Sequence, residues 1–169
     1  MNKLTIKETE FSDLTNIMKL WNNGDVMKYV GFEDGLNITK EQIEKWHKNI
    51  KRALYTKHYS IYHEELGFCG ETFYSIIKKH DLGMLDIKLF DFARKKGIAK
   101  FSLEYAIKEV FDNDLCSKVY VDPSVKNKDA WKLYEKIGFI QKERPTFLEP
   151  ADVYLELTKK DFEKLVTTK

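Results

Sequence analysis

The sequence has few residues that cross-link or interrupt a chain: of its 169 residues, only two are cysteine, Cys69 and Cys116, and only three are proline. Two cysteines cannot build a disulfide framework, which predicts reduced thiols and a cytoplasmic location. The N-terminus carries no apolar signal region, and no run approaches the roughly 20 apolar residues that span a membrane. We therefore expect no membrane partner.

An excess of charge of either sign is also missing. The 29 lysines and arginines are nearly balanced by 27 aspartates and glutamates, which leaves a formal net charge of +2. Because nucleic-acid-binding domains usually carry a strongly basic surface, this balance argues against a nucleic-acid partner. The four histidines are not spaced with the cysteines as metal ligands are, so we expect no metal site.

The residues that are present favour a folded α+β chain. Hydrophobic residues make up 43% and aromatic residues 14%, which argues against disorder, and the length fits one domain over residues 1–169. Alternation predicts strands at 4–8, 59–63, 68–77, 84–89, 118–121, 139–142 and 154–158. Helical spacing and capping residues predict helices from 12 or 13 to 21, from 39 to about 53, at 97–110 and at 127–137. Several hairpins precede the third helix, so the sheet is expected to be mixed rather than fully parallel.

A basic turn joins the predicted strand at 84–89 to the helix that opens at Gly97. The first N–H groups of a helix have no partner within the helix, and the helix dipole adds partial positive charge there. Glycine lets an anion come close to the backbone. An ordinary solvated run of charge is the alternative. We expect a phosphate group to bind at this turn, whose residues are Arg94, Lys95, Lys96, Gly97, Ile98, Ala99 and Lys100.

Three segments, taken in order and spacing, resemble the GCN5-related N-acetyltransferase (GNAT) superfamily. They are Arg94-x-x-Gly97-x-Ala99, Val121-Asp122-Pro123-Ser124 with Asn127 and Ala130, and Leu133-Tyr134-Glu135-Lys136-x-Gly138-Phe139. The resemblance covers residues 68–162. It implies the GNAT fold, with a mixed, mostly antiparallel sheet of about six to seven strands flanked by about four helices. It also implies that acetyl-CoA is the acetyl donor and that the basic turn binds its pyrophosphate.

Within the superfamily, the run at 85–89 and the later motifs are closest to the aminoglycoside 6′-N-acetyltransferases. That likeness implies that Asp86 lies beside the acceptor amine and Tyr134 beside the thioester sulfur. It also implies cofactor contacts from the backbone of the strand at 84–89 and from the helix at 127–137. The residues are Ile87, Lys88, Leu89, Asn127 and Lys136. The acceptor half shows no concentrated acidic run of the kind that would hold a polycationic sugar.

The predicted function is acetyl transfer to a primary amine of a small molecule, aminoglycoside-like or polyamine-like, by direct attack in a ternary complex. A protein N-terminal or lysine acetyltransferase and a non-catalytic acyl-CoA-binding module are the alternatives. The chain is expected to be a monomer or a homodimer.

Each proposed catalytic residue also has a purely structural interpretation. Asp86 is the candidate base or orienting carboxylate, but it could be solvated or paired with Lys88 or an arginine. Tyr134 is the candidate acid, but it could be a core tyrosine. Glu71 is a second carboxylate candidate, although an exposed strand glutamate is the more expected reading. Asn127 could serve as a helix N-cap.

Overall fold

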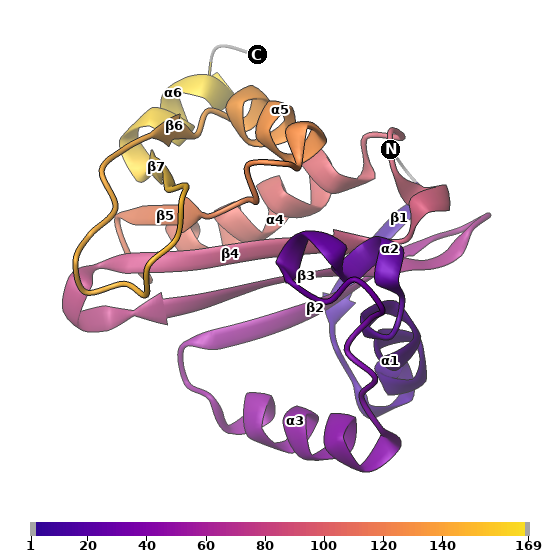
Figure 1. The fold of residues 1–169 in the computed structure, drawn as a ribbon. Helices are drawn as coiled ribbons and strands as arrows, with labels where there is room; N and C mark the ends of the chain where they lie inside the picture. Colours follow the sequence, from indigo (N-terminus) through magenta and orange to yellow (C-terminus); the bar gives the residue numbers. More distant parts are fainter. Residues whose placement is uncertain (1–2, 168–169) are drawn as a thin grey trace.

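The structure is a computed structural model that describes residues 3–167, and its centre is a seven-stranded sheet (Figure 1). The strands lie in the order β1-β2-β3-β4-β5-β7-β6. Their bounds are β1 Leu4–Glu8, β2 Thr56–His63, β3 Gly67–Ile77, β4 Leu82–Leu89, β5 Lys118–Val121, β6 Ile140–Gln141 and β7 Leu155–Thr158. β4 and β5 pair in parallel, and the other neighbouring strands pair antiparallel. The expected mixed, mostly antiparallel sheet is therefore confirmed.

Six α-helices flank the sheet in the described residues, two more than the sequence predicted. Their bounds are α1 Leu14–Trp21, α2 Gly24–Met27, α3 Lys40–Arg52, α4 Ile98–Asp112, α5 Lys128–Ile137 and α6 Lys159–Thr167. The additional helices are α2, which has only four residues, and α6. Lys159 and Lys160 form the first turn of α6, whose Phe162 packs against Phe111 of α4 with ring centroids 5.8 Å apart.

Local sequence signals set the ends of the longer helices. Thr39 and Gln42 form the capping box expected at the start of α3, where the Gln42 N–H donates to the Thr39 hydroxyl at 3.3 Å. Asn127 caps α5 by accepting the N–H of Ala130 at 3.1 Å. Gly138 closes the same helix in the left-handed conformation that its position requires. No described helix is long and apolar enough to cross a membrane.

The two faces of the sheet are covered by different helices (Figure 1). α4 packs on β3 and β4, and its buried residues join one large core cluster with α5 and α6. α1 and α3 lie on the opposite face against β3 and β2. Alternation along β4 divides its side chains in the same way: Leu85 and Leu89 are buried in core clusters, whereas Asp86 and Lys88 belong to the other face.

β4 and β5 separate after a short parallel contact. Their pairing covers only Leu82 to Met84 of β4 against Lys118 to Tyr120 of β5. β4 continues to Leu89 while remaining paired with β3 on its other side. Within residues 3–167, the last five residues of β4 therefore have no partner strand on the side of β5. We call this opening the β4–β5 gap.

The close approach of β3 to β4 beside this gap depends on a glycine and yields a first prediction. A Cβ atom at Gly70 would lie 2.0 Å from the backbone oxygen of Lys88, and Gly70 has a φ of +156°. We expect Gly70→Ala to lower the free energy of unfolding by about 3 kcal/mol or more, because overpacking adds to backbone strain. Urea denaturation measures this loss.

Gly67→Ala is the matched control on the same strand. Gly67 also has positive φ, +72°, but a Cβ there meets nothing within 4 Å. Only backbone strain applies, so the expected loss is about 1 kcal/mol. Equal losses for the two variants would show that the contact with β4 is not what requires glycine at position 70.

Candidate functional site

The two residues that the sequence proposed for catalysis lie close enough for the Asp86 carboxylate to act electrostatically on the Tyr134 phenol. Asp86 lies on β4 two residues beyond its last pair with β5, and its side chain is 30% exposed. Tyr134 lies on α5, is buried, and packs edge-on against Phe139 with ring centroids 5.7 Å apart. Burial raises the pKa of the Tyr134 phenol, and the nearby carboxylates of Asp86 and Asp122 raise it further. The hydroxyl of Tyr134 therefore stays protonated well above neutral pH.

The Asp86 carboxylate is held by its two neighbours on the strand. One oxygen accepts the backbone N–H of Ile87 at 2.7 Å, and the other accepts from the ammonium group of Lys88. The pairing with Lys88 was one of the structural alternatives foreseen for Asp86. It means that the N–H of Ile87 is already engaged by a side chain.

Glu71 of β3 is not the exposed strand residue that we considered more expected. Its side chain is 1% exposed and has three partners, two that hydrogen-bond to it and one that forms an ion pair. These are the indole N–H of Trp21 at 2.7 Å, Nε2 of His58 at 2.7 Å and the ammonium group of Lys88 at 3.6 Å. Burial raises the pKa of Glu71, but His58, Lys88 and Trp21 together outweigh it and hold the pKa below its usual value. The carboxyl is therefore ionised and is enclosed by its three partners.

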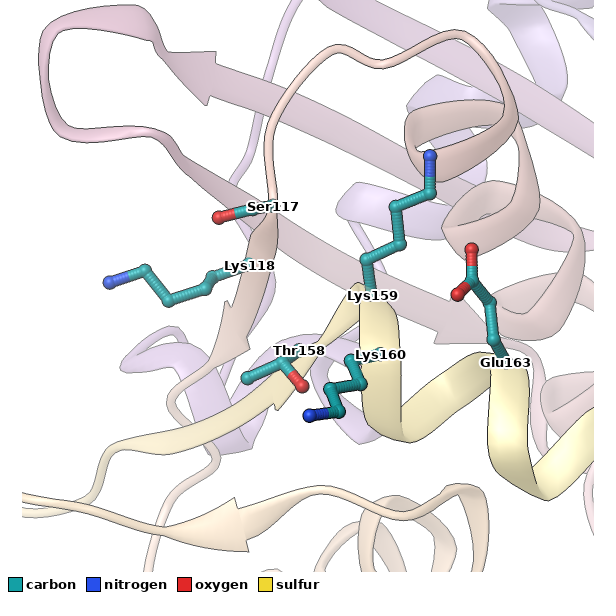
Figure 2. Close-up of a pocket in the computed structure, with 6 residues that line it drawn as sticks. All are labelled: Ser117, Lys118, Thr158, Lys159, Lys160 and Glu163. Atoms are coloured by element: carbon teal, nitrogen blue, oxygen red, sulfur yellow. The ribbon is translucent and has the colours of Figure 1, made fainter.

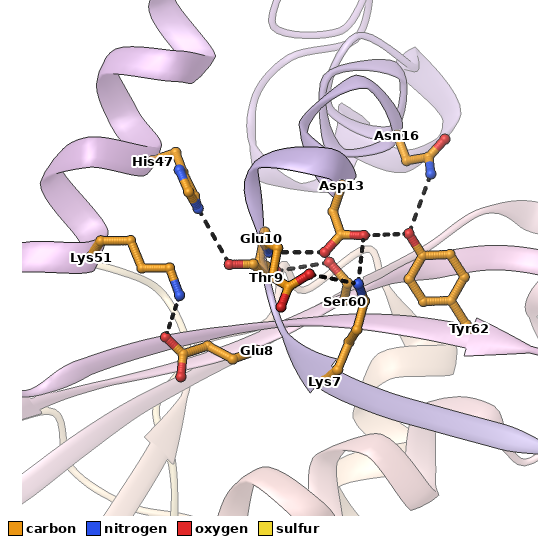
Figure 3. A network of polar contacts seen from close by, with 10 residues as sticks. All are labelled: Lys7, Glu8, Thr9, Glu10, Asp13, Asn16, His47, Lys51, Ser60 and Tyr62. Atoms are coloured by element: carbon orange, nitrogen blue, oxygen red, sulfur yellow. Dashed lines mark hydrogen bonds and ion pairs between the residues drawn. The ribbon is translucent and has the colours of Figure 1, made fainter.

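A buried polar chain continues from Glu71 to the N-terminal strand. An ionised carboxylate only accepts hydrogen bonds, so Nε2 of His58 carries a proton. Its Nδ1 lies 2.8 Å from the hydroxyl of Thr9, which lies 2.8 Å from the hydroxyl of Ser60. The backbone oxygen of Thr9 is 3.3 Å from Nε2 of His47 on α3 (Figure 3). Thr9 therefore connects β1, β2 and α3 on this face.

The basic turn leaves the start of α4 open to an anion. Gly97 is the N-cap of the helix, has a φ of +78° and provides no side-chain cap for the first N–H groups. Lys95 is also left-handed, with a φ of +57°. A Cβ at Gly97 would meet nothing within 4 Å, and Lys95 and Lys96 are exposed around it. Free helix N–H groups, the helix dipole and two lysines form the environment that binds phosphate.

The other residues expected at the cofactor site have different surroundings. The guanidinium of Arg94 donates to the backbone oxygens of Leu89 at 3.2 Å and Asp25 at 3.1 Å. It therefore ties the end of β4 to α2. Lys100 lies 3.5 Å from Glu104 on the same helix, and Lys136 is exposed on the last turn of α5. Contact of Arg94, Lys100, Asn127 and Lys136 with the cofactor remains a prediction.

These elements fit the pantetheine and pyrophosphate of acetyl-CoA. The β4 edge at Ile87, Lys88 and Leu89 lacks a partner strand and can pair with an extended amide chain as an added strand does. The open N-terminus of α4, with Ile98 and Ala99 in its first turn, follows directly and can hold the phosphates. The bound group would supply an acetyl thioester at the gap.

A shallow pocket elsewhere on the molecule does not belong to this site (Figure 2). Its lining residues are Ser117, Lys118, Thr158, Lys159, Lys160 and Glu163. Lys118 begins β5, whereas the gap opens beyond the other end of the β4–β5 pairing. The amine of Lys159 is bonded to the backbone oxygen of Phe111 and to Asp114, so part of the positive charge here is already paired.

Sequence reasoning missed the side chains that surround the two candidates. His58 and Trp21 were not linked to Glu71, and Lys88 was considered chiefly for its backbone. One available signal was the alternation of Asp86 and Lys88 with Leu85, Ile87 and Leu89 on β4. Among nearby aromatic residues, Trp21 is half-buried and donates to Glu71, while Tyr29 and Phe32 are exposed.

Comparison with solved structures finds closely similar folds. Spermidine N-acetyltransferase from Vibrio cholerae, in complex with CoA and spermine, superposes with a TM-score of 0.83 at 19% identity. The match covers 96% of this chain and 99% of that one. RimL, a ribosomal-protein alpha-N-acetyltransferase in complex with coenzyme A, gives 0.78 at 13% identity, covering 94% and 95%. A GNAT-family acetyltransferase from Bacillus anthracis gives 0.75 at 17% identity, covering 94% and 96%.

Comparison with curated proteins finds no match. At these identities the structural likeness establishes the fold alone. The family model for the acetyltransferase (GNAT) domain matches residues 3–140, which is most of the chain. This match is consistent with two features of the structure, the uncapped N-terminus of α4 and the unpaired edge of β4. The chain therefore belongs to the GNAT family and is an acetyl-CoA-dependent N-acetyltransferase.

Proposed function

We propose that the enzyme acetylates a primary amine of a small molecule by direct attack in a ternary complex, with Asp86 and Tyr134 as the catalytic residues. The observation that supports this proposal is that Asp86 lies on β4 beyond its last pair with β5 and that its carboxylate acts electrostatically on the Tyr134 phenol. Most of the rate gain comes from holding the amine against the thioester, which is worth roughly 7–11 kcal/mol in favourable cases. Aminoglycoside-like and polyamine-like amines are the first acceptors to test.

Asp86 orients the amine and receives its proton. The carboxylate already accepts one N–H group and one ammonium group, so it presents oxygens suited to an amine. When an acceptor N–H takes the place of the Ile87 N–H at Oδ1, that backbone donor becomes free. The freed N–H can then donate to the acetyl oxygen, where negative charge develops as the amine attacks.

Tyr134 supplies a proton to the leaving sulfur. Its hydroxyl has no hydrogen-bond partner among the described residues 3–167, so it is available to a group entering the gap. Because burial and two carboxylates raise its pKa, it is protonated whenever the cofactor binds at neutral pH. The N–C bond forms as the C–S bond breaks, one proton leaves the amine for Asp86, and one leaves Tyr134 for sulfur.

Acetylation of a protein N-terminus is the second candidate. The structural similarity to RimL supports it, since that enzyme acts on a ribosomal protein. The two candidates differ in what must enter the acceptor side: a small amine needs only the gap, whereas a peptide needs an extended groove beside it. The same assay separates them.

The first test measures CoA release from acetyl-CoA with a panel of amines. The panel contains monoamines, polyamines, aminoglycosides and short peptides with free N-termini. We expect turnover with at least one small-molecule amine and much less with peptides. Turnover confined to peptides would favour the second candidate. Tight acetyl-CoA binding without turnover on any amine would favour a non-catalytic module.

Gly97→Asp should abolish acetyl-CoA binding, because a carboxylate would lie where the phosphates are expected. Isothermal titration measures the loss. Gly97→Ala is the control: it adds the same backbone strain at φ +78° without charge, and nothing obstructs its Cβ. We expect Gly97→Ala to lose roughly tenfold at most, the factor that corresponds to about 1.4 kcal/mol. Undiminished affinity in Gly97→Asp would rule out the turn as the phosphate site.

Tyr134→Phe should lower kcat about 10²-fold or more with little change in acetyl-CoA affinity, because it removes the proton donor and keeps the ring packed on Phe139. Tyr154→Phe removes another buried hydroxyl, one that donates to Glu156, and should leave kcat unchanged. If Tyr134→Phe turns over at the normal rate, the tyrosine serves packing alone.

Asp86→Asn should lower kcat by a similar factor and alter the kcat–pH profile, because an amide cannot accept the amine proton. Steady-state rates across a pH series measure both effects. A rate and profile identical to those of the unaltered enzyme would exclude Asp86 from the reaction.

A further inference from the structure

The ammonium group of Lys88 lies in surroundings that would bind an external alkylammonium ion. It contacts the carboxylate of Asp86, lies 3.6 Å from that of Glu71, and is 5.9 Å from the ring centroid of Phe73. Its side chain is only 13% exposed. Two carboxylates and an aromatic face are the groups by which proteins recognise protonated amines. In this structure the ammonium group that occupies these surroundings is that of the Lys88 side chain.

Lys88 is held in place by a rigid partner. His58 and Trp21 each hydrogen-bond to Glu71 at 2.7 Å and fix the position of its carboxylate, which in turn holds the ammonium group of Lys88. Burial lowers the pKa of Lys88, but Asp86 and Glu71 more than offset it and raise the pKa above its usual value. The positive charge is therefore permanent at the working pH of the enzyme.

Three carboxylates on or next to the central strands have cationic partners from the chain. Lys88 serves Asp86 and Glu71, and Arg144 lies 3.1 Å from the carboxylate of Asp122. A polycationic acceptor gains affinity by placing several ammonium groups on uncompensated carboxylates. Lys88 shares its single positive charge between Asp86 and Glu71 and occupies the space between them, so a second ammonium group at this place would be repelled by Lys88.

We propose that Lys88 is a specificity-determining residue, the internal occupant of an alkylammonium subsite that Asp86, Glu71 and Phe73 form at the acceptor end of the gap. This inference rests on the proposed function and narrows it: the preferred acceptors carry a single amine near the reacting centre, and polyamines gain nothing from their additional charges. Removal of the lysine side chain vacates the subsite and admits an external ammonium group.

The test compares equilibrium binding of spermine and butylamine to the CoA complex of three proteins: the unaltered chain, Lys88→Met and Lys88→Arg. Titration calorimetry at low salt needs no turnover. We expect Lys88→Met to bind spermine about tenfold more tightly or better, the order measured for close charge pairs, and to bind butylamine more tightly as well. Lys88→Arg keeps a cation in place and should match the unaltered chain. Equal spermine affinity in all three proteins would overturn the proposal.

A second variant covers the case in which Lys88→Met does not fold, because Glu71 would lose a partner. The double variant Lys88→Met/Glu71→Gln removes one charge of each sign and still vacates the space beside Asp86. We expect it to bind butylamine about tenfold more tightly than the unaltered chain does. Affinity equal to that of the unaltered chain would show that Lys88 does not fill an amine site.

Turnover distinguishes failure of this inference from failure of the proposed function. If no amine is acetylated but Lys88→Met still gains affinity for spermine, the proposed reaction is wrong and the subsite stands. If the unaltered enzyme acetylates amines and its kcat/KM rises steeply from mono- to di- to triamine, the reaction stands and the role of Lys88 is wrong.

Discussion

The rest of the molecule depends on the separation of β4 from β5 after three paired residues. Two parallel neighbours require a crossover connection, and here α4 supplies it. A crossover helix must start where the first strand ends, so the N-terminus of α4 comes to the same end of β4 as the unpaired strand edge. A single feature of the topology therefore places an extended backbone edge and an anion-binding helix terminus side by side.

On the opposite face of the sheet, the buried carboxylate of Glu71 imposes the second constraint. An ionised group with 1% exposure is tolerated only when its partners replace water, and removal of one partner from a buried pair typically costs about 3–5 kcal/mol. The partners come from α1, β2 and β4, so Trp21, His58 and Lys88 are fixed together. Lys88 also pairs with Asp86, so the fixed position of Lys88 holds the proposed orienting carboxylate in place.

Much of this structure could be predicted from local signals. The capping box at Thr39, the left-handed Gly138 and the alternation along β4 each act over a few residues, so the sequence displays them directly. The burial of Glu71 could not be predicted in this way, because its donors lie 13, 17 and 50 positions away and converge only when α1 covers the sheet. α6 was missed for the same reason: its start depends on Phe162 meeting α4.

The alternation of β4 has a consequence for how such an enzyme can evolve. Leu85 and Leu89 are buried in core clusters, so a substitution at either position disturbs the packing of its neighbours. Asp86 and Lys88 alternate with them and face the acceptor side. Exchange of Lys88 would leave these hydrophobic contacts as they are, but it would remove a partner of the buried Glu71 carboxylate, so a new side chain at position 88 calls for a compensating change at position 71. Acceptor chemistry and fold stability are therefore coupled on this strand through one buried carboxylate.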